Sequence, residues 1–174
     1  MLAAMVLLGA SLLAACSDLA ARRIPNALTF GVAALAIGFS ALHGPWSVLV
    51  SILLFAIVFV AGSFPYGRGW IGGGDVKLLA AGAALANWPG AATFLLATAL
   101  AGGVLSTVEL ARQGRLRVTM NRFAVAAAAG SLEAGMDSDP TRRNKLPYAL
   151  AIAAGALVLL ASETFAPWLQ LVRA

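Results

Sequence analysis

The chain has 174 residues, of which 61% are apolar and only 11% are charged, and its mean hydropathy is +0.89. A water-soluble protein needs enough polar side chains to cover its apolar core, and this chain has too few. The composition therefore excludes a soluble globular domain and predicts an integral membrane protein. The single cysteine, Cys16, excludes an intramolecular disulfide and a cysteine-rich zinc site. The net charge of +5 does not by itself indicate nucleic-acid binding, because in a membrane chain the positions of the charges matter more than their sum.

Six apolar stretches follow one another along the chain, and turn-forming or polar residues separate them. They cover residues 2–17, 27–42, 46–63, 76–88, 91–110 and 146–162. Inside a bilayer the backbone has no water to bond, so spanning segments of this composition form helices. The sequence therefore predicts an all-α, polytopic membrane protein in which residues 1–174 form a single domain, a bundle of six transmembrane helices.

Lysine and arginine are distributed unevenly between the connections. Eleven of the twelve lie in, or at the edges of, the first, third and fifth connections, whereas the second and fourth connections have none. Because basic residues accumulate on the cytoplasmic side, both termini are expected outside and the odd connections in the cytoplasm. The fifth connection, residues 112–145, is then a cytoplasmic loop. We expect residues 119–133 to form a surface helix and the arginines of the loop to contact anionic headgroups.

The first stretch ends in Leu-Ala-Ala-Cys at residues 13–16, which fits the cleavage box of a bacterial lipoprotein. A signal peptide has basic residues before its apolar segment, whereas residues 1–9 have none and Arg22 and Arg23 follow the segment. This order of charges favours a first helix that is retained in the protein. Cys16 is then expected to be a small buried packing residue.

Two of the seven acidic residues lie where this topology brings them to the same side of the membrane. Asp18 is near the cytoplasmic end of the first predicted helix, and Asp75 is at the cytoplasmic start of the fourth. A carboxylate beside a membrane span is costly and therefore indicates a functional site, although a pair of interface acids neutralised by nearby basic residues is the alternative. We expect the two carboxyl groups to meet.

The residues next to each acid favour a site for a peptide. Three glycines, residues 72–74, precede Asp75 and permit an extended peptide to approach the turn, so that its carbonyl group comes near the carboxylate. Asp18 is followed by the rigid turn at Pro25 and Asn26, and we expect Asn26 to cap the second helix.

This arrangement resembles the prepilin peptidase (type IV leader peptidase) family of G-x-G-D aspartic proteases. The resemblance depends on three elements: Asp18 followed by Ile24-Pro25-Asn26, then Gly72-x-Gly74-Asp75-Val76-Lys77-Leu78, then Lys145-Leu146-Pro147-Tyr148. It implies that Asp18 and Asp75 are the catalytic pair and that the leader of a prepilin or pseudopilin is cleaved on the cytoplasmic side. It also implies a set of residues that bind substrate or shape the site: Gly72, Gly74, Lys77, Pro25, Asn26, Pro147 and Tyr148.

The chain is most similar to the short, peptidase-only members that accompany tight-adherence (Flp-type) pilus systems. Long bifunctional members add a cytoplasmic domain with paired cysteines and methylate the new amino terminus, whereas this chain has one cysteine and no room for that domain. The resemblance therefore implies no methyltransferase activity, no metal and no cofactor. Its implied partners are a prepilin or pseudopilin helix and the lipid bilayer, without nucleic acid, in the bacterial cytoplasmic (inner) membrane.

Two residues of this set have a second interpretation. Lys77 lies about 200° round the helix from Asp75, so we expect it either to anchor the helix at the membrane interface or to contact substrate. Pro147 and Tyr148 begin the last helix, where Tyr148 is either part of a substrate groove or an ordinary interface aromatic.

Two carboxyl groups that share a site favour hydrolysis by a water molecule. Like charges a few Å apart cannot both ionise cheaply, so one proton is retained. The charged group takes a proton from the attacking water, and the protonated group donates a hydrogen bond to the scissile carbonyl oxygen. The helix dipole favours Asp75, at a helix N-terminus, as the base and Asp18, at a C-terminus, as the acid.

Two other functions fit the same acids. A presenilin-like intramembrane protease also has a G-x-G-D motif, but its partner aspartate lies in the directly preceding helix, whereas Asp18 comes three segments earlier. A non-enzymatic bundle, such as a small transporter or a proton-relay subunit, would use Asp18 and Asp75 to pass protons. No internal repeat supports a transporter.

Overall fold

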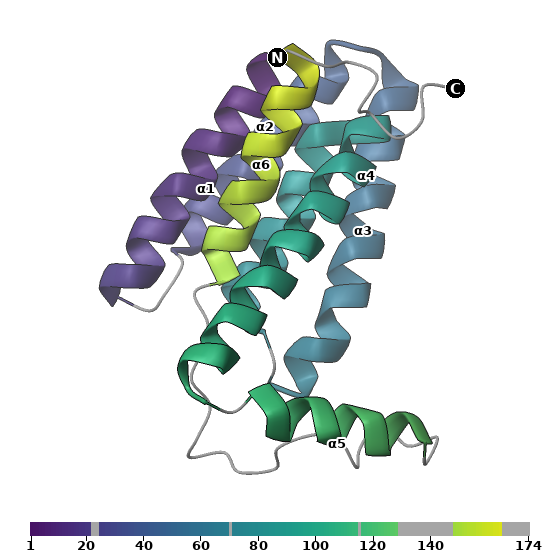
Figure 1. The fold of residues 1–174 in the computed structure, drawn as a ribbon. Helices are drawn as coiled ribbons and strands as arrows, with labels where there is room; N and C mark the ends of the chain where they lie inside the picture. Colours follow the sequence, from purple (N-terminus) through teal and green to yellow (C-terminus); the bar gives the residue numbers. More distant parts are fainter. Residues whose placement is uncertain (22–24, 70, 115, 129–147, 165–174) are drawn as a thin grey trace. The chain divides into compact units, whose positions relative to one another are not determined.

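The computed structural model describes residues 1–21, 25–69, 71–114, 116–128 and 148–164. These residues are helical, without strands, as Figure 1 shows. The helices are α1 (Leu2–Ala21), α2 (Asn26–Ala41), α3 (Pro45–Gly67), α4 (Gly73–Arg112), α5 (Leu116–Ala128) and α6 (Tyr148–Thr164). The prediction of an all-α chain is confirmed. α1, α3 and α4 are long and apolar enough to cross a membrane, and α2 and α6 are shorter apolar helices.

Proline and glycine set the boundaries of α2 and α3. Pro25, in an extended conformation, precedes the first residue of α2, and Pro45 begins α3, where its missing N–H leaves no hydrogen bond unmade. Gly44 between the two helices has a φ of 103°, which L side chains rarely adopt. The prediction that Asn26 caps α2 is wrong. The capping position belongs to Pro25 and has no side-chain hydrogen bond, and Asn26 is already the first helical residue.

α4 consists of two helical arms, residues 73–86 and 89–112, which meet at a break. Asn87 has φ 51° and ψ 179°, and Trp88 has φ −84° and ψ 139°, so neither continues the helix. The Asn87 amide fixes the break: its Nδ2 donates a hydrogen bond to Ser47 Oγ at 2.6 Å, and its Oδ1 accepts one from the Trp88 N–H at 2.7 Å. The turn expected between the fourth and fifth apolar stretches is therefore present, stabilised from α3.

The structure forms two compact units, Met1–Gly102 with Pro147–Ala174, and Gly103–Leu146. The second unit contains the end of α4 and the helix α5, which follows a turn at Gly114, where φ is 67°. α5 corresponds to the expected surface helix but begins at Leu116, and residues 129–133 of that expectation lie outside the described residues.

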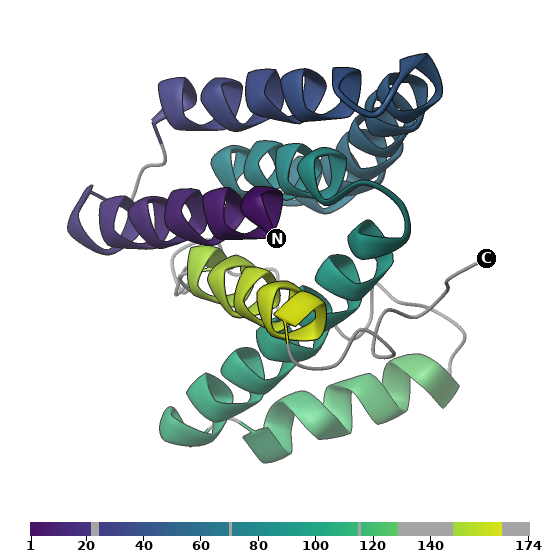
Figure 2. The same cartoon turned by 90° about the horizontal axis from the view of Figure 1, so that it is seen from above.

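The first arm of α4 is the centre of the first unit, and every residue from 80 to 85 is buried. Figure 2 shows this arm in the middle of the bundle, with α2 on one side and α6 on the other. Small residues permit this burial: a Cβ atom on Gly82 would lie 3.0 Å from Leu7 Cδ1 of α1 and 2.9 Å from Phe94 Cζ. Lipid is as apolar as the core, so close approach of backbones stabilises the bundle in place of the hydrophobic effect.

α1 directs one stripe of residues into this core. Ala4, Leu7, Ser11 and Ala14 are buried, at the helical spacing of three or four residues. The expectation that Cys16 is buried is wrong, because it lies off this stripe and its side chain is exposed.

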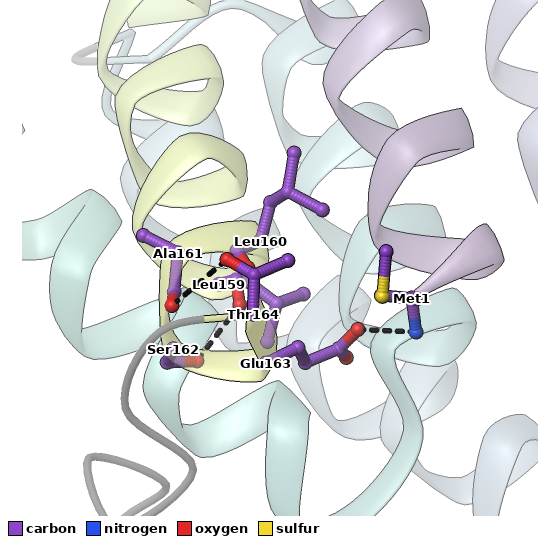
Figure 3. A network of polar contacts seen from close by, with 7 residues as sticks. All are labelled: Met1, Leu159, Leu160, Ala161, Ser162, Glu163 and Thr164. Atoms are coloured by element: carbon purple, nitrogen blue, oxygen red, sulfur yellow. Dashed lines mark hydrogen bonds and ion pairs between the residues drawn. The ribbon is translucent and has the colours of Figure 1, made fainter.

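Contacts between distant segments gather at two ends of the first unit. At one end, the amino group of Met1 lies 2.5 Å from the Glu163 carboxylate, so α1 and α6 are antiparallel (Figure 3). The hydrogen bond from Asn87 of α4 to Ser47 of α3 likewise joins two helices. At the other end, Lys77 of α4 reaches Asn26 of α2. The starts of α2 and α4 thus lie at one end of the first unit, and the start of α3 and the break in α4 lie at the other.

Candidate active site

Asp75 lies in the first turn of α4, and its carboxyl group is only 9% exposed. Gly72 precedes the helix and makes two contacts with its first turn. Its carbonyl oxygen accepts a hydrogen bond from the Val76 N–H at 3.2 Å, and its own N–H donates one to the Asp75 carboxylate. The second bond is one half of a capping box, in which the side chain of the third helical residue accepts a hydrogen bond from the N–H of the residue before the helix. Asp75 is therefore held by the backbone of its own motif.

The remaining Asp75 oxygen, Oδ1, is buried and has no hydrogen-bond partner among the described residues. A buried acceptor without a partner is costly and usually marks a place that water or a ligand completes. Gly72 lies on the other side of the carboxyl group, since a Cβ atom there would be 2.8 Å from Oδ2. One oxygen of Asp75 is thus held by the motif, and the other is available.

Asp18 continues the buried stripe of α1, four residues after Ala14 and in the last turn of the helix. Its side chain is half-buried. The carboxyl groups of Asp18 and Asp75 are close enough to interact electrostatically, although 57 positions separate them in the chain. The two acids that the sequence singled out therefore lie within electrostatic range of each other.

Tyr148, the first residue of α6, lies at the same end and also interacts electrostatically with Asp75. Its ring rests on the second arm of α4, where a Cβ atom on Gly102 would come within 3.1 Å of Tyr148 Cε2. The break at Asn87 makes this contact possible, because it returns the second arm to the end at which the first arm begins. Pro147 lies outside the described residues.

The turn before Asp75 and the start of α2 are joined by a side-chain hydrogen bond. Lys77 Nζ donates to Asn26 Oδ1 at 3.2 Å, so two of the expected site residues contact each other. Pro25 directly precedes Asn26 in an extended conformation. Gly74 is half-buried within the first turn of α4.

The sequence profile of the type IV leader peptidase family matches residues 5–107, more than half of the chain. The chain belongs to the type IV leader peptidase family. It is therefore a prepilin-type leader peptidase in general terms, and its apolar helices agree with a multi-pass membrane protein. No curated protein and no solved structure matches the chain.

The matched part of this leader peptidase contains both acids, the three glycines and the Lys77–Asn26 contact, and it ends before Tyr148. Among the residues that the structure describes, no cluster of three or more histidine, cysteine or acidic side chains is present that would hold a metal ion. The described side chains of the site are therefore those of an acid pair with a neighbouring phenol and ammonium group.

Two residues that support the site of this leader peptidase were not identified from the sequence. Tyr66, near the end of α3, lies against Gly73, where a Cβ atom would be 3.0 Å from Tyr66 Cε2. Gly102 makes room for the Tyr148 ring. Neither has a neighbour in sequence that would reveal it, since both act through contacts between helices. A glycine within an apolar helix is the one available signal, because it often marks a close helix contact.

Proposed function

We propose that this leader peptidase is a membrane aspartic endopeptidase that removes the leader of a prepilin or pseudopilin, with Asp18 and Asp75 acting together on one water molecule. The electrostatic interaction between the two carboxyl groups, at the end of α1 and the start of α4, carries the proposal. Two acids that come together on one water molecule share a proton more readily than they both ionise, which is the state that hydrolysis by an acid pair needs.

The two oxygens of Asp75 have different roles in this mechanism. The oxygen beside Gly72 is held by the backbone, and the unpartnered Oδ1 accepts a proton from the attacking water. Asp18, which retains the shared proton, donates a hydrogen bond to the scissile carbonyl oxygen and later gives the proton to the leaving amine. Two opposing effects act on Asp75: the helix N-terminus favours its charged form, and burial favours its protonated form. The proposal gives Asp75 the role of the base. No covalent intermediate is required.

The proposed topology has six membrane spans, with both termini outside and the acid pair on the cytoplasmic side of the inner membrane. Two observations support it. Nearly all basic residues lie in the odd connections of the sequence. The Lys77–Asn26 hydrogen bond agrees with a shared end for the starts of α2 and α4, and the Asn87–Ser47 hydrogen bond agrees with a shared end for the start of α3 and the break in α4. The prepilin leader would then be presented to the acids from the cytoplasm.

Cleavage of a candidate prepilin by the purified protein in proteoliposomes tests the activity. We expect a mass shift of the substrate with the unaltered protein, and its loss with Asp18→Asn and with Asp75→Asn. Glu109→Gln is the matched control, because this acid lies in the second unit and bonds locally to Gln113 at 2.8 Å. Retention of cleavage by either aspartate variant would contradict the shared mechanism.

Single cysteines test the topology independently of the chemistry. In a Cys16→Ser background, His43→Cys and Gly67→Cys place one exposed thiol at each end of α3. A maleimide that does not cross membranes should label only the His43→Cys protein in intact spheroplasts, and both proteins after permeabilisation. Labelling of Gly67→Cys in intact spheroplasts would reverse the proposed orientation.

A further inference from the structure

The hydrogen bond from Lys77 to Asn26 joins the two sequence motifs that contain the acids. Lys77 follows Asp75 by two residues on α4, and Asn26 follows Asp18 by eight positions at the start of α2. The first turn of α2 is itself held by a hydrogen bond from Thr29 Oγ1 to the Asn26 carbonyl oxygen at 2.9 Å. This bond uses the backbone oxygen of Asn26 and restrains its position, and the side-chain oxygen accepts the bond from Lys77.

Lys77 points away from Asp75 around α4, and its described partner is an amide without charge. The bond consequently fixes a distance between two helices and does not neutralise either carboxyl group. A cation that only balanced the acids would contact one of them directly.

The acid pair needs such a restraint because its two members repel each other whenever both are charged. α1 packs on α6 and enters the core at Leu7 and at Ala14, four residues before Asp18. Asp18 lies beyond these contacts in the last turn of α1, where the last carbonyl groups of a helix have no partner within the helix and the end is the least restrained. The start of α2, close to Asp18 in the chain, is where a local restraint has the greatest effect.

We propose that Lys77 is a positioning residue, which through Asn26 holds the end of α1 and the start of α2 against α4 and so sets the separation of Asp18 and Asp75. This role rests on the proposed function, since it concerns the same acid pair. In this role neither side chain acts on the reacting atoms. Their effect is on the geometry of the acids, and small displacements of reacting groups have large effects on rate.

Steady-state cleavage by the variants Lys77→Met, Asn26→Ala and their combination tests this role. We expect each single change to lower kcat about tenfold with KM within about twofold, and the double variant to be no worse than either single variant, because all three lose the same bond. Lys77→Arg and Asn26→Asp keep a donor and an acceptor, and they should retain most of the activity. Effects that multiply, a change mainly in KM, or no change in kcat would each overturn the inference.

A distance measurement separates failure of this inference from failure of the proposed function. Spin labels on the native Cys16 and on Gly67→Cys, where a side chain meets no atom within 4 Å, report the separation of α1 and α3 at the acid end. We expect a narrow distribution in the parent and in Lys77→Arg, and a broader, longer one in Lys77→Met and Asn26→Ala. Asn87→Ala at the opposite end is the control and should leave it narrow.

These distances decide the inference even if the parent protein cleaves no prepilin. Unchanged distributions in Lys77→Met and Asn26→Ala would overturn it, whether or not the protein is active. Loss of cleavage in Asp75→Asn together with unchanged kcat in Lys77→Met would leave the proposed function standing and remove only the positioning role.

Discussion

A Cβ atom on Gly72 would lie 2.8 Å from Asp75 Oδ2, closer than Cβ atoms come to the atoms around them in proteins. The residue before α4 must therefore be glycine for the carboxyl group to take its present position. The motif thus has a steric reason for its first glycine, in addition to any approach by substrate.

Gly72→Ala should lower kcat on a prepilin about 10- to 100-fold, because the new methyl group displaces the Asp75 carboxyl group by a fraction of an ångström or more. Thermal unfolding should change little, since Gly72 is exposed and lies outside the helix. Gly67→Ala is the matched control, because nothing lies within 4 Å of its added methyl group. Equal activity of the two variants would show that the carboxyl group has another position available.

Gly102→Ala should lower cleavage several-fold, on the order of the loss caused by a small displacement at an active site. The added methyl group would press on the Tyr148 ring at 3.1 Å and shift the phenol that interacts electrostatically with Asp75. Gly103→Ala, the next residue, meets nothing within 4 Å and should be fully active. Comparison of the two initial rates on one substrate checks this prediction, and a loss in Gly103→Ala alone would contradict it.

Gly155→Ala should destabilise the bundle by about 1–3 kcal/mol, the usual cost of overpacking. A methyl group here would overlap Thr98 Oγ1 and lie 3.0 Å from the Phe94 carbonyl oxygen, which belongs to the backbone and cannot rotate away. The melting temperature in detergent measures the effect. Gly38→Ala on α2 is the control, because its methyl group would have open space around it, and it should be neutral or slightly stabilising. A similar loss of stability in both variants would argue against close packing of α6 on α4.

Asn87→Ala should lower stability by about 1–3 kcal/mol, because it removes the hydrogen bonds to Ser47 and to the Trp88 N–H and leaves alanine at a φ of 51°. Asn87→Gly keeps the positive φ without strain and loses only the amide. Its melting temperature should therefore lie between those of Asn87→Ala and the parent. If Asn87→Gly were no more stable than Asn87→Ala, the backbone conformation would not contribute to the loss.

The arrangement of the helices along the chain could be predicted from sequence, because its signals are local. Polar connections mark the ends of apolar stretches, and the Asn-Trp-Pro-Gly sequence at residues 87–90 marks the break in α4. The prediction that Asp18 and Asp75 lie at the same end follows from counting the apolar stretches between them, and their electrostatic interaction agrees with it. For these features no knowledge of side-chain packing is needed.

The orientation of each helix could not be predicted in the same way. In water the apolar stripe of a helix identifies its buried face, but here the surface that faces lipid is as apolar as the core. Cys16 was therefore expected inside although it is exposed, and the stripe from Ala4 to Asp18 became visible only in the structure. The Lys77–Asn26 bond was missed for the same reason, since it depends on how α2 and α4 are rotated.

The alanine and glycine residues at the centre of the first unit also affect the entropy of folding. Alanine and glycine have no side-chain rotamers to lose on burial, whereas each leucine or methionine gives up about 0.5–2 kcal/mol of rotational freedom. The buried run at residues 80–85 contains four alanines and one glycine beside a single leucine. Burial of this core therefore costs little side-chain conformational entropy. The remaining cost is backbone entropy, most of which a helix has already lost when it forms in the membrane.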